Sequence, residues 1–280
     1  IRPSQFIFSF GVGALLDLPQ LSVMILGLQN WDVRYSQELS EDRLLAALQR
    51  RLGRQVAQLL HPPIPPEDQQ ANPAAPPIGV PVVPFPRWLR CPKCQSMGTI
   101  ESGLFELIQD RYRPDFTRYV HVSCPKPGKP PTALPMRFLL ACRDGHLTDF
   151  PWIEFVHAGK AICKPARLSM YEFGPSGDVL DIMIKCHSCN TSRSMSEAFD
   201  RDPPFACPGH HPHLRQINPN GCPEPAKPIL LGASNSWFPQ VMSVLSIPDS
   251  GNDALAQLVD AHWASALGCH SGLRPRILSR

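Results

Sequence analysis

Two Cys-x-x-Cys pairs constrain this chain more than any other feature of its sequence. The pairs are Cys91–Cys94 and Cys186–Cys189, and they belong to a set of ten cysteines among 280 residues. In an intracellular protein this spacing is typical of metal-binding turns, whereas disulfide frameworks are typical of secreted domains. A redox-active pair is the less favoured alternative, because neither motif has the strand-then-helix setting that activates a thiolate.

Eight of the cysteines fall into two groups along the sequence, and we predict one zinc ion for each group. The first group is Cys91, Cys94, Cys124 and Cys142, and the second is Cys186, Cys189, Cys207 and Cys222. Four thiolates leave no open coordination position, so both sites are expected to be structural. Three residues could take the place of Cys124 or Cys142 in the first group: Cys163, His146 and His121. Cys163 could equally lie in the core, and Cys269 is expected to be unliganded.

The high proline content predicts an irregular fold. The chain has 33 prolines and 18 glycines, which favours short strands, many loops and few long helices. We expect strands at 21–28, 136–141 and 182–184, and a helix at 41–60 whose leucines recur at three- and four-residue spacing. The predicted fold class is α+β, proline-rich and irregular, with two zinc-ribbon-like four-cysteine modules.

The distribution of proline and cysteine also predicts the domain organisation. Residues 1–60 form an N-terminal strand and helix region, and residues 61–87 form a proline-rich linker. Residues 88–250 form a cysteine-rich body, and residues 251–280 form a tail. No run of 18 apolar residues is present, so we expect no membrane-spanning helix and a cytoplasmic protein.

One segment combines basic and aromatic residues in the way that single-stranded nucleic acid favours. Its candidate contacts are Arg111, Tyr112, Arg113, Phe116, Arg118 and Tyr119. Aromatic rings can stack on unpaired bases while guanidinium groups contact phosphates. The same pattern also arises in an ordinary half-exposed strand pair. The formal charge of +3 does not decide between these interpretations, because eight zinc-bound thiolates would cancel it.

A second candidate site would be catalytic. His146, Asp149 and His157 lie close together in the sequence and could perform acid–base chemistry in a metal-dependent nuclease or hydrolase. No nucleophile motif accompanies them, and buried hydrogen-bonding histidines are the favoured interpretation. Likewise, the glycine pair at Gly11 and Gly13 is not followed by the residues of a phosphate-binding loop.

Three segments resemble the DrmB family. They are Arg2–Gln5 with Phe10–Pro19, then Asp144–Trp152 with His157 after it, and finally Gly232–Pro239 with Leu245–Pro248. They occur in the family's order and together span most of residues 1–250. Members of that family are longer than this chain, and the tail 251–280 matches none of their segments. We therefore expect a fragment, or a tail joined across a missing segment.

The resemblance to the DrmB family implies a function. DrmB is a component of the DISARM bacterial anti-phage system and partners the helicase DrmA, which supplies the ATP-driven motor. The resemblance thus implies a zinc-containing, non-enzymatic subunit that docks on a DrmA-like helicase and helps to grip DNA with single-stranded character. It supplies no catalytic residue. Trp237 and Phe238 are candidate anchors for the helicase interface, since large aromatic residues often dominate such contacts, and the alternative is that both lie in this chain's own core.

Overall fold

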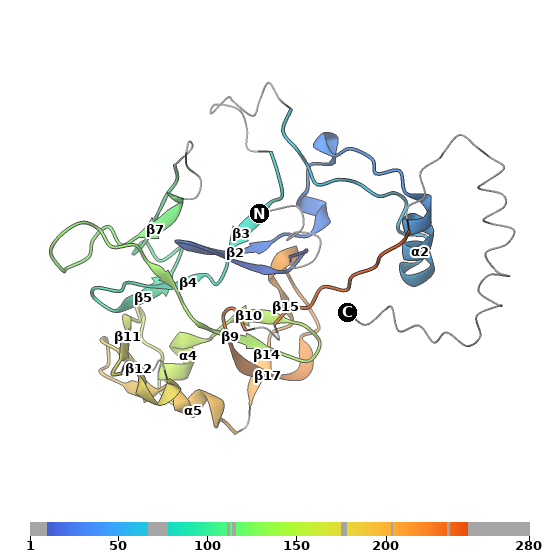
Figure 1. Ribbon diagram of the computed structural model, residues 1–280. Helices are drawn as coiled ribbons and strands as arrows, with labels where there is room; N and C mark the ends of the chain where they lie inside the picture. Colours follow the sequence, from blue (N-terminus) through green and yellow to red (C-terminus); the bar gives the residue numbers. More distant parts are fainter. Residues whose placement is uncertain are drawn as a thin grey trace, which may run out of the picture. The chain divides into compact units, whose positions relative to one another are not determined.

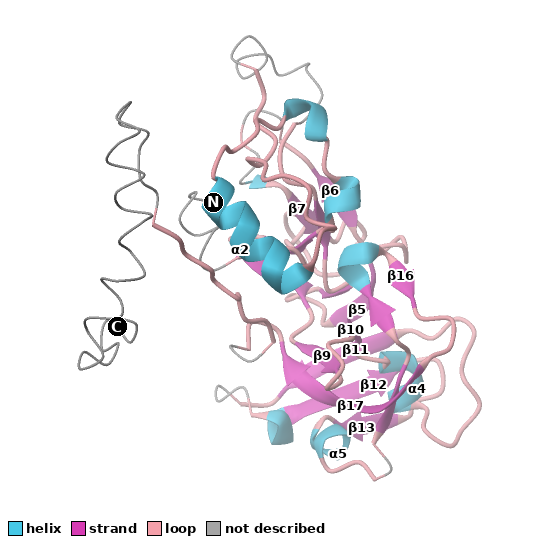
Figure 2. Ribbon diagram, turned by 90° about the vertical axis from the view of Figure 1, so that its right-hand side faces the viewer, coloured by secondary structure: helices cyan, strands magenta, loops and turns pink. Residues whose placement is uncertain are grey.

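The protein is mostly β-structure with few helices, so the expected α+β class is corrected toward β. The computed structural model describes residues 10–66, 78–110, 113, 116–174, 178–202, 204–233 and 236–245. Short strands dominate this part of the chain, as Figures 1 and 2 show. Proline explains the preponderance of loops, because it lacks the N–H that helices and ladders require.

All strand pairs in the described residues are antiparallel, and they form five sheets. The six-stranded sheet has the order β13 (Ser192–Ser194), β12 (Ile182–Cys186), β11 (Leu168–Glu172), β5 (Ser96–Thr99), β4 (Trp88–Arg90) and β8 (Leu134–Pro135). The four-stranded sheet has the order β10 (Leu147–Asp149), β9 (Phe138–Ala141), β17 (Cys222–Leu230) and β14 (Phe205–Cys207). The three-stranded sheet is β1 (Leu15–Leu18), β2 (Leu21–Ile25) and β3 (Val82–Pro84). The two hairpin-like pairs are β6 (Glu106–Ile108) with β7 (Arg118–Val120), and β15 (His210–His211) with β16 (Gln216–Ile217).

The helices are short. They are α2 (Asp42–Leu52), α4 (Trp152–Val156) and α5 (Ser196–Phe199), with 3-10 turns at Leu28–Asn30, Val33–Tyr35, Val179–Asp181 and Pro212–Leu214. The helix expected at 41–60 therefore exists but ends eight residues early. Gly53 has φ 86°, a left-handed conformation that stops a helix and that glycine adopts without strain.

The described residues fall into two compact units. One comprises the described residues of 1–37 and 60–241, and the other those of 38–59 and 242–280. The first unit holds all five sheets, and the second holds α2. Within the first unit, β3 lies in the segment predicted as a proline-rich linker. It pairs with β2 on one side only, and an edge strand is where a sheet tolerates proline.

The largest core lies between the six-stranded and four-stranded sheets. On β12, Ile182, Ile184 and Cys186 are buried and alternate with more exposed residues, as expected of a strand with one face in the core. Trp152 of α4 is fully buried in the same cluster, where Phe150 lies 4.6 Å from it between ring centroids. The strands expected at 136–141 and 182–184 correspond to β9 and β12, and both contribute to this core.

Two of the segments that resemble DrmB meet in the first unit. Trp237 packs against the core of the three-stranded sheet, and its Nε1 donates a hydrogen bond to the carbonyl of Val12 at 3.2 Å. A Cβ at Gly11 would lie only 3.0 Å from the Trp237 ring, which accounts for glycine at that position. Trp237 is therefore half-buried against this chain's own core, whereas Phe238 is 71% exposed and remains a candidate interface anchor.

Asp149 connects the two large sheets. Its Oδ1 accepts hydrogen bonds from the backbone N–H groups of Arg87 (2.9 Å) and Trp88 (3.3 Å), where β4 begins. Burial raises the pKa of the Asp149 carboxyl to about 6, and the two backbone donors oppose that rise only in part. The folded protein therefore binds a proton at Asp149 more readily than the unfolded chain does.

Replacing Asp149 by Asn is expected to flatten the pH dependence of stability between about pH 4 and 6. Because the pKa is higher in the folded state, the stabilisation from Asp149 is complete below about pH 4 and is lost as the pH rises through 6. The pKa shift means that ionisation of Asp149 lowers the free energy of unfolding by roughly 3 kcal/mol at neutral pH. The Asp149→Asn variant has no ionisable group at this position, so it does not show this loss.

The free energy of unfolding of the wild type and of the Asp149→Asn variant is measured by denaturant at a series of pH values. Any loss of metal at acid pH affects both proteins, so it does not contribute to the difference between them. Asp17→Asn is the control, since Asp17 is exposed on β1. Parallel pH profiles for the wild type and Asp149→Asn would contradict the assignment.

Candidate metal centres

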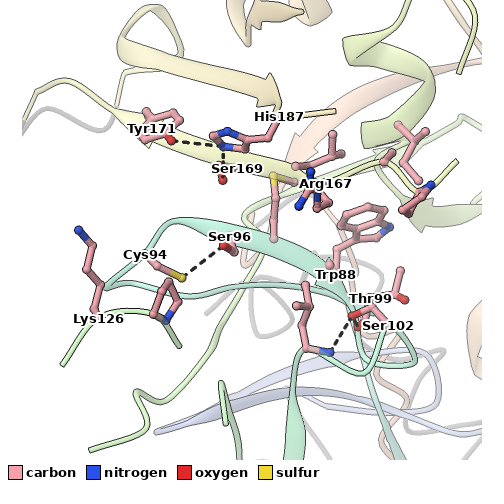
Figure 3. Close-up of a pocket in the computed structure, with 18 residues that line it drawn as sticks. Trp88, Cys94, Ser96, Thr99, Ser102, Lys126, Arg167, Ser169, Tyr171 and His187 are labelled. Carbon is pink, nitrogen blue, oxygen red and sulfur yellow. Dashed lines mark hydrogen bonds between the residues drawn. The ribbon is translucent and has the colours of Figure 1, made fainter. Parts of the chain in front are cut away.

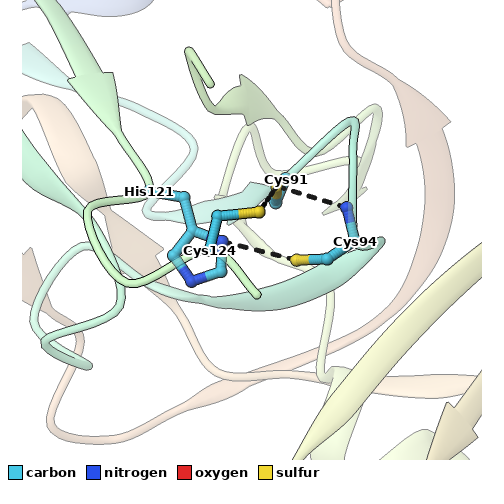
Figure 4. Close-up of side chains that lie close together, drawn as sticks. All are labelled: Cys91, Cys94, His121 and Cys124. Atoms are coloured by element: carbon cyan, nitrogen blue, oxygen red, sulfur yellow. Dashed lines mark hydrogen bonds between the residues drawn. The ribbon is translucent and has the colours of Figure 1, made fainter. Parts of the chain in front are cut away.

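The first metal-ligand group gathers around the turn between β4 and β5. Cys91 and Cys94 lie in that turn, and His121 and Cys124 follow the end of β7. Figure 4 shows the four side chains pointing toward one another. Cys94 Sγ lies 3.4 Å from His121 Nδ1, and Cys91 Sγ lies 3.8 Å from Cys124 Sγ. We call this group the first tetrad.

The second tetrad is Cys142, His146, Cys207 and Cys222, at one end of the four-stranded sheet. Cys142 follows β9 and His146 precedes β10, while Cys207 ends β14 and Cys222 begins β17. Antiparallel pairing in the order β10-β9-β17-β14 brings these four strand ends to the same end of the sheet. Cys142 Sγ lies 3.3 Å from His146 Nδ1 and 4.0 Å from Cys222 Sγ.

The third tetrad is His157, Cys163, Cys186 and Cys189. His157 follows α4, and Cys186 ends β12 and starts the turn that holds Cys189. His157 Nδ1 donates a hydrogen bond to the carbonyl of Ile153 at 2.7 Å, so the proton of a neutral ring lies on Nδ1. Its Nε2 is buried and has no hydrogen-bond partner among the residues that the structure describes. A histidine held in this way by a carbonyl presents its other nitrogen as a metal ligand.

Zinc fits the donor atoms of all three tetrads. Each offers three cysteine sulfurs and one histidine nitrogen, the soft and borderline donors that Zn²⁺ prefers. In every tetrad the four donor atoms lie within 4.8 Å of one another. A tetrahedral site with Zn–S bonds of about 2.3 Å requires sulfurs about 3.8 Å apart, close to the separations seen here. With four protein ligands and no open position, such sites are structural.

The local environment favours the thiolate at the most exposed ligand. Hydrogen bonds from the hydroxyl and the backbone N–H of Thr191 lower the pKa of Cys189 to about 6. At neutral pH the Cys189 thiol is then largely deprotonated, which is the state that binds metal. In the first tetrad, by contrast, burial raises the pKa of Cys91 to about 11, so metal binding there must release a proton.

The structure groups the eight predicted ligands differently from the sequence. Cys142 joins Cys207 and Cys222 because β9 pairs with β17. Cys186 and Cys189 are consequently completed by His157 and Cys163, and the two expected four-cysteine modules are replaced by three groups of three cysteines and one histidine. His121, considered as a replacement for Cys142, takes that place in the first tetrad. Cys269 lies outside the described residues.

The predicted nucleic-acid segment is only partly available as a binding surface. Arg111 and Tyr112 lie outside the described residues. The guanidinium carbon of Arg113 lies 3.8 Å from the centroid of the Phe116 ring and covers it. Arg118 is half-buried and donates a hydrogen bond from Nη1 to the carbonyl of Phe116. Tyr119 is 7% exposed and belongs to the core around Leu89, so its ring cannot stack on a base.

The candidate catalytic trio does not assemble into one site. His146 belongs to the second tetrad and His157 to the third, whereas Asp149 binds backbone N–H groups of β4. The segment Asp144–Trp152, one of the three that resemble DrmB, therefore contributes to separate structural features. It carries the candidate metal ligand His146, the inter-sheet contact of Asp149 and the core residue Trp152.

Two of the three histidines in the tetrads had a local signal in the sequence. His121 and Cys124 have the same spacing as a Cys-x-x-Cys pair, and Cys142 and His146 flank Gly145, whose φ of 80° forms the turn between them. His157 has no such local signal, because it is 29 residues from Cys186. Only the packing of α4 against β12 and β13 brings it to the third tetrad.

The fold and the tetrads define a class of protein: a β-rich protein whose short strands are joined at three sites of zinc-binding type. Residues 2–238 match the family model described as "Domain of unknown function (DUF8724)", and the chain belongs to this family. It is also 25% identical over 241 residues to the DISARM protein DrmB of Bacillus paralicheniformis. That match covers 85% of this chain and confirms the resemblance to DrmB. The chain spans about two fifths of the relative's length, since the match covers 38% of it.

Proposed function

We propose that this chain is a zinc-stabilised, non-catalytic subunit of an anti-phage helicase complex, and that it helps to hold DNA. The observation that carries the proposal is the set of three closed tetrads in a chain similar to a DISARM protein. Each tetrad uses all four coordination positions of a tetrahedral zinc ion and leaves none for substrate or water. Zinc bound there would stabilise the fold and take no part in a reaction.

The arrangement of the strands explains why the fold needs such sites. The strands of the described chain are short, and many contribute only two to five residues. The tetrads join strand ends that lie far apart in the sequence, such as Cys142 and Cys222. A metal ion bound between these strand ends would stabilise the fold, as longer strands or helices do in other proteins. The result is a rigid support for surface loops, on which a binding function can depend.

The similarity to DrmB supports the proposal of a helicase partner. The resemblance to the DrmB family supplies DrmA as the partner type. Exposed apolar residues give this interaction a physical basis, for example Phe238 and Leu245, which are 71% and 70% exposed. Burial of such side chains against another protein would be favourable, and large aromatic residues are frequent anchors of interfaces.

The purified chain is expected to show no ATPase activity, because its proposed role leaves the motor to the helicase. The natural full-length protein, purified from its own cells under mild conditions, should elute with a helicase, and that complex should hydrolyse ATP in response to DNA. Size-exclusion chromatography with mass spectrometry identifies the partner, and a coupled assay measures ATP hydrolysis with and without DNA.

Three results would contradict the proposal in different ways. DNA-stimulated ATP hydrolysis by the isolated chain would show that it is itself the motor. Metal-dependent cleavage of DNA by the isolated chain, abolished in Asp149→Ala but retained in Asp17→Ala, would support the nuclease alternative instead. Elution of the full-length protein as a monomer would remove the helicase partner while leaving the zinc sites intact.

A further inference from the structure

A groove of about 830 Å³ opens between β5 and β11, inside the six-stranded sheet. The two strands pair at only two positions, Leu168 with Met97 and Ser169 with Ser96, so the sheet separates beyond them. The groove lies between two tetrads. Cys94 of the first tetrad lines one side, and His187, in the Cys186–Cys189 turn of the third tetrad, lines the other. Figure 3 shows this arrangement.

The charged residues of the groove are cations without counter-ions. Lys126 and Arg167 line it and are exposed, and its lining contains no aspartate or glutamate. Within the described residues, neither side chain has a hydrogen bond or an ion pair. Some other arginines of the described chain are paired with carboxylates, for example Arg87 with Glu101, Arg137 with Glu172, and Arg193 with Glu197. Two unpaired cations in one hollow favour an anionic ligand.

The wall formed by β11 adds fixed polar groups. Ser169 is 3% exposed, and its Oγ lies 3.0 Å from His187 Nε2. The hydroxyl of Tyr171 lies 3.4 Å from the same nitrogen. These contacts hold the His187 ring and the end of the Tyr171 side chain against the strand. The groove thus has a positioned polar wall, as specific binding sites do, beside its two cations.

Aromatic rings continue this wall beyond the groove. Tyr171 of β11 and Phe173, which follows the end of that strand, have ring centroids 6.4 Å apart and planes 21° apart. Phe173 is 73% exposed, so its ring is open to contact with a ligand. Nearly parallel rings next to unpaired cations are the combination that binds single-stranded nucleic acid, where bases stack on rings and phosphates contact cations.

We propose that this groove binds single-stranded DNA, with Lys126 and Arg167 contacting phosphates and with Tyr171 and Phe173 stacking bases. The inference rests on the proposed function, because that function supplies DNA as the ligand. The groove volume of about 830 Å³ lies within the roughly 300–1,000 Å³ of small-ligand sites, which is room for nucleotides of a single strand. The surface differs from the segment 111–119, where Tyr119 is buried.

One alternative explains the cations without DNA. Three thiolates and one Zn²⁺ give each loaded tetrad a formal charge of −1, and Lys126 is only two residues from Cys124. Lys126 and Arg167 could then serve to balance the charge of the neighbouring tetrads. In that case their removal would weaken zinc binding and leave DNA affinity unchanged. A measurement of both properties on the same variants separates the two roles.

The test uses the zinc-loaded chain and a fluorescent oligothymidylate, with binding measured at several salt concentrations. The double variant Lys126→Ala, Arg167→Ala is expected to bind roughly tenfold more weakly or worse, and to lose about 1.4 from the log–log salt slope, at about 0.7 for each phosphate contact. Phe173→Ala should weaken binding without changing the slope, since it removes stacking and no charge. Zinc content should stay at the wild-type value in each variant.

A matched control is available on the other side of the core. Arg201 and Lys227 line a hollow of only about 150 Å³, and the double variant Arg201→Ala, Lys227→Ala removes the same charge. This control should retain affinity and slope. An equal loss in both double variants would overturn the groove as the site and indicate a non-specific charge effect. Loss of zinc without loss of DNA affinity would establish the charge-balancing role instead.

The remaining outcomes distinguish the groove from the proposed function. If the wild type binds the oligonucleotide and the groove variants bind equally well, the groove assignment fails and a DNA-holding subunit remains. If the wild type binds no single-stranded DNA at all, both fail. Equal affinity for a duplex of the same length would overturn single-strand selectivity, because paired bases cannot stack on Tyr171 and Phe173.

Discussion

Removal of zinc is expected to unfold the sheets of the first unit. Cys91 and Cys186 are fully buried, and Cys207 also belongs to the main core, so these ligands are part of the packed interior. Structural zinc contributes on the order of 10 kcal/mol of apparent binding energy per site, comparable to the whole stability of a typical domain. A strong chelator should therefore abolish the near-ultraviolet circular dichroism of the aromatic core around Trp152.

Elemental analysis of the same protein before chelation should give three zinc ions per chain. Readdition of zinc under reducing conditions should restore the spectrum, which separates loss of metal from aggregation or cysteine oxidation. An unchanged spectrum after complete removal of zinc would show that the core is stable without the tetrads. Native protein that contains no zinc would contradict the metal assignment itself.

Replacement of a single histidine ligand is expected to remove one zinc ion and leave the other two. His157→Ala should reduce the content from three to two, because the buried Nε2 of His157 is the only nitrogen donor of the third tetrad. His121→Ala and His146→Ala should have the same effect on the first and second tetrads. Each loss should destabilise the first unit by several kcal/mol, on the order expected for a broken structural site.

His61→Ala is the matched control, since His61 is exposed and belongs to no tetrad. It should keep three zinc ions and the wild-type unfolding midpoint. The grouping derived from the sequence, with two four-cysteine sites, makes the opposite prediction: all of the histidine variants would then retain their full zinc content.

The sequence allowed the local features of the metal sites to be predicted, but not their composition. A Cys-x-x-Cys turn is defined by four adjacent residues, so Cys91–Cys94 and Cys186–Cys189 could be recognised directly. The partners of each turn depend on strand pairing over long distances, such as β9 with β17, whose paired residues are about 90 positions apart. Spacing along the sequence favoured Cys142 for the first group, whereas pairing across the sheet places it in the second tetrad.

The same distinction applies to the binding surfaces. The alternation of basic and aromatic residues at 111–119 was visible, but the burial of Tyr119 against Leu89 and Phe105 was not, since it depends on packing of distant segments. Lys126, Arg167 and Tyr171 have no shared motif, and only the separation of β5 from β11 brings them to one groove. For Trp237, both a core and an interface position were considered, and its contact with Val12 shows that the core position holds.

X-ray absorption spectroscopy of the native, zinc-loaded chain tests the central claim most directly, because it counts the sulfur and nitrogen ligands of each metal ion. Three tetrads of three cysteines and one histidine predict an average of three sulfurs at about 2.3 Å and one nitrogen at about 2.0 Å per zinc, with three zinc ions in each chain. Four sulfurs per zinc, with two zinc ions in each chain, would contradict this arrangement.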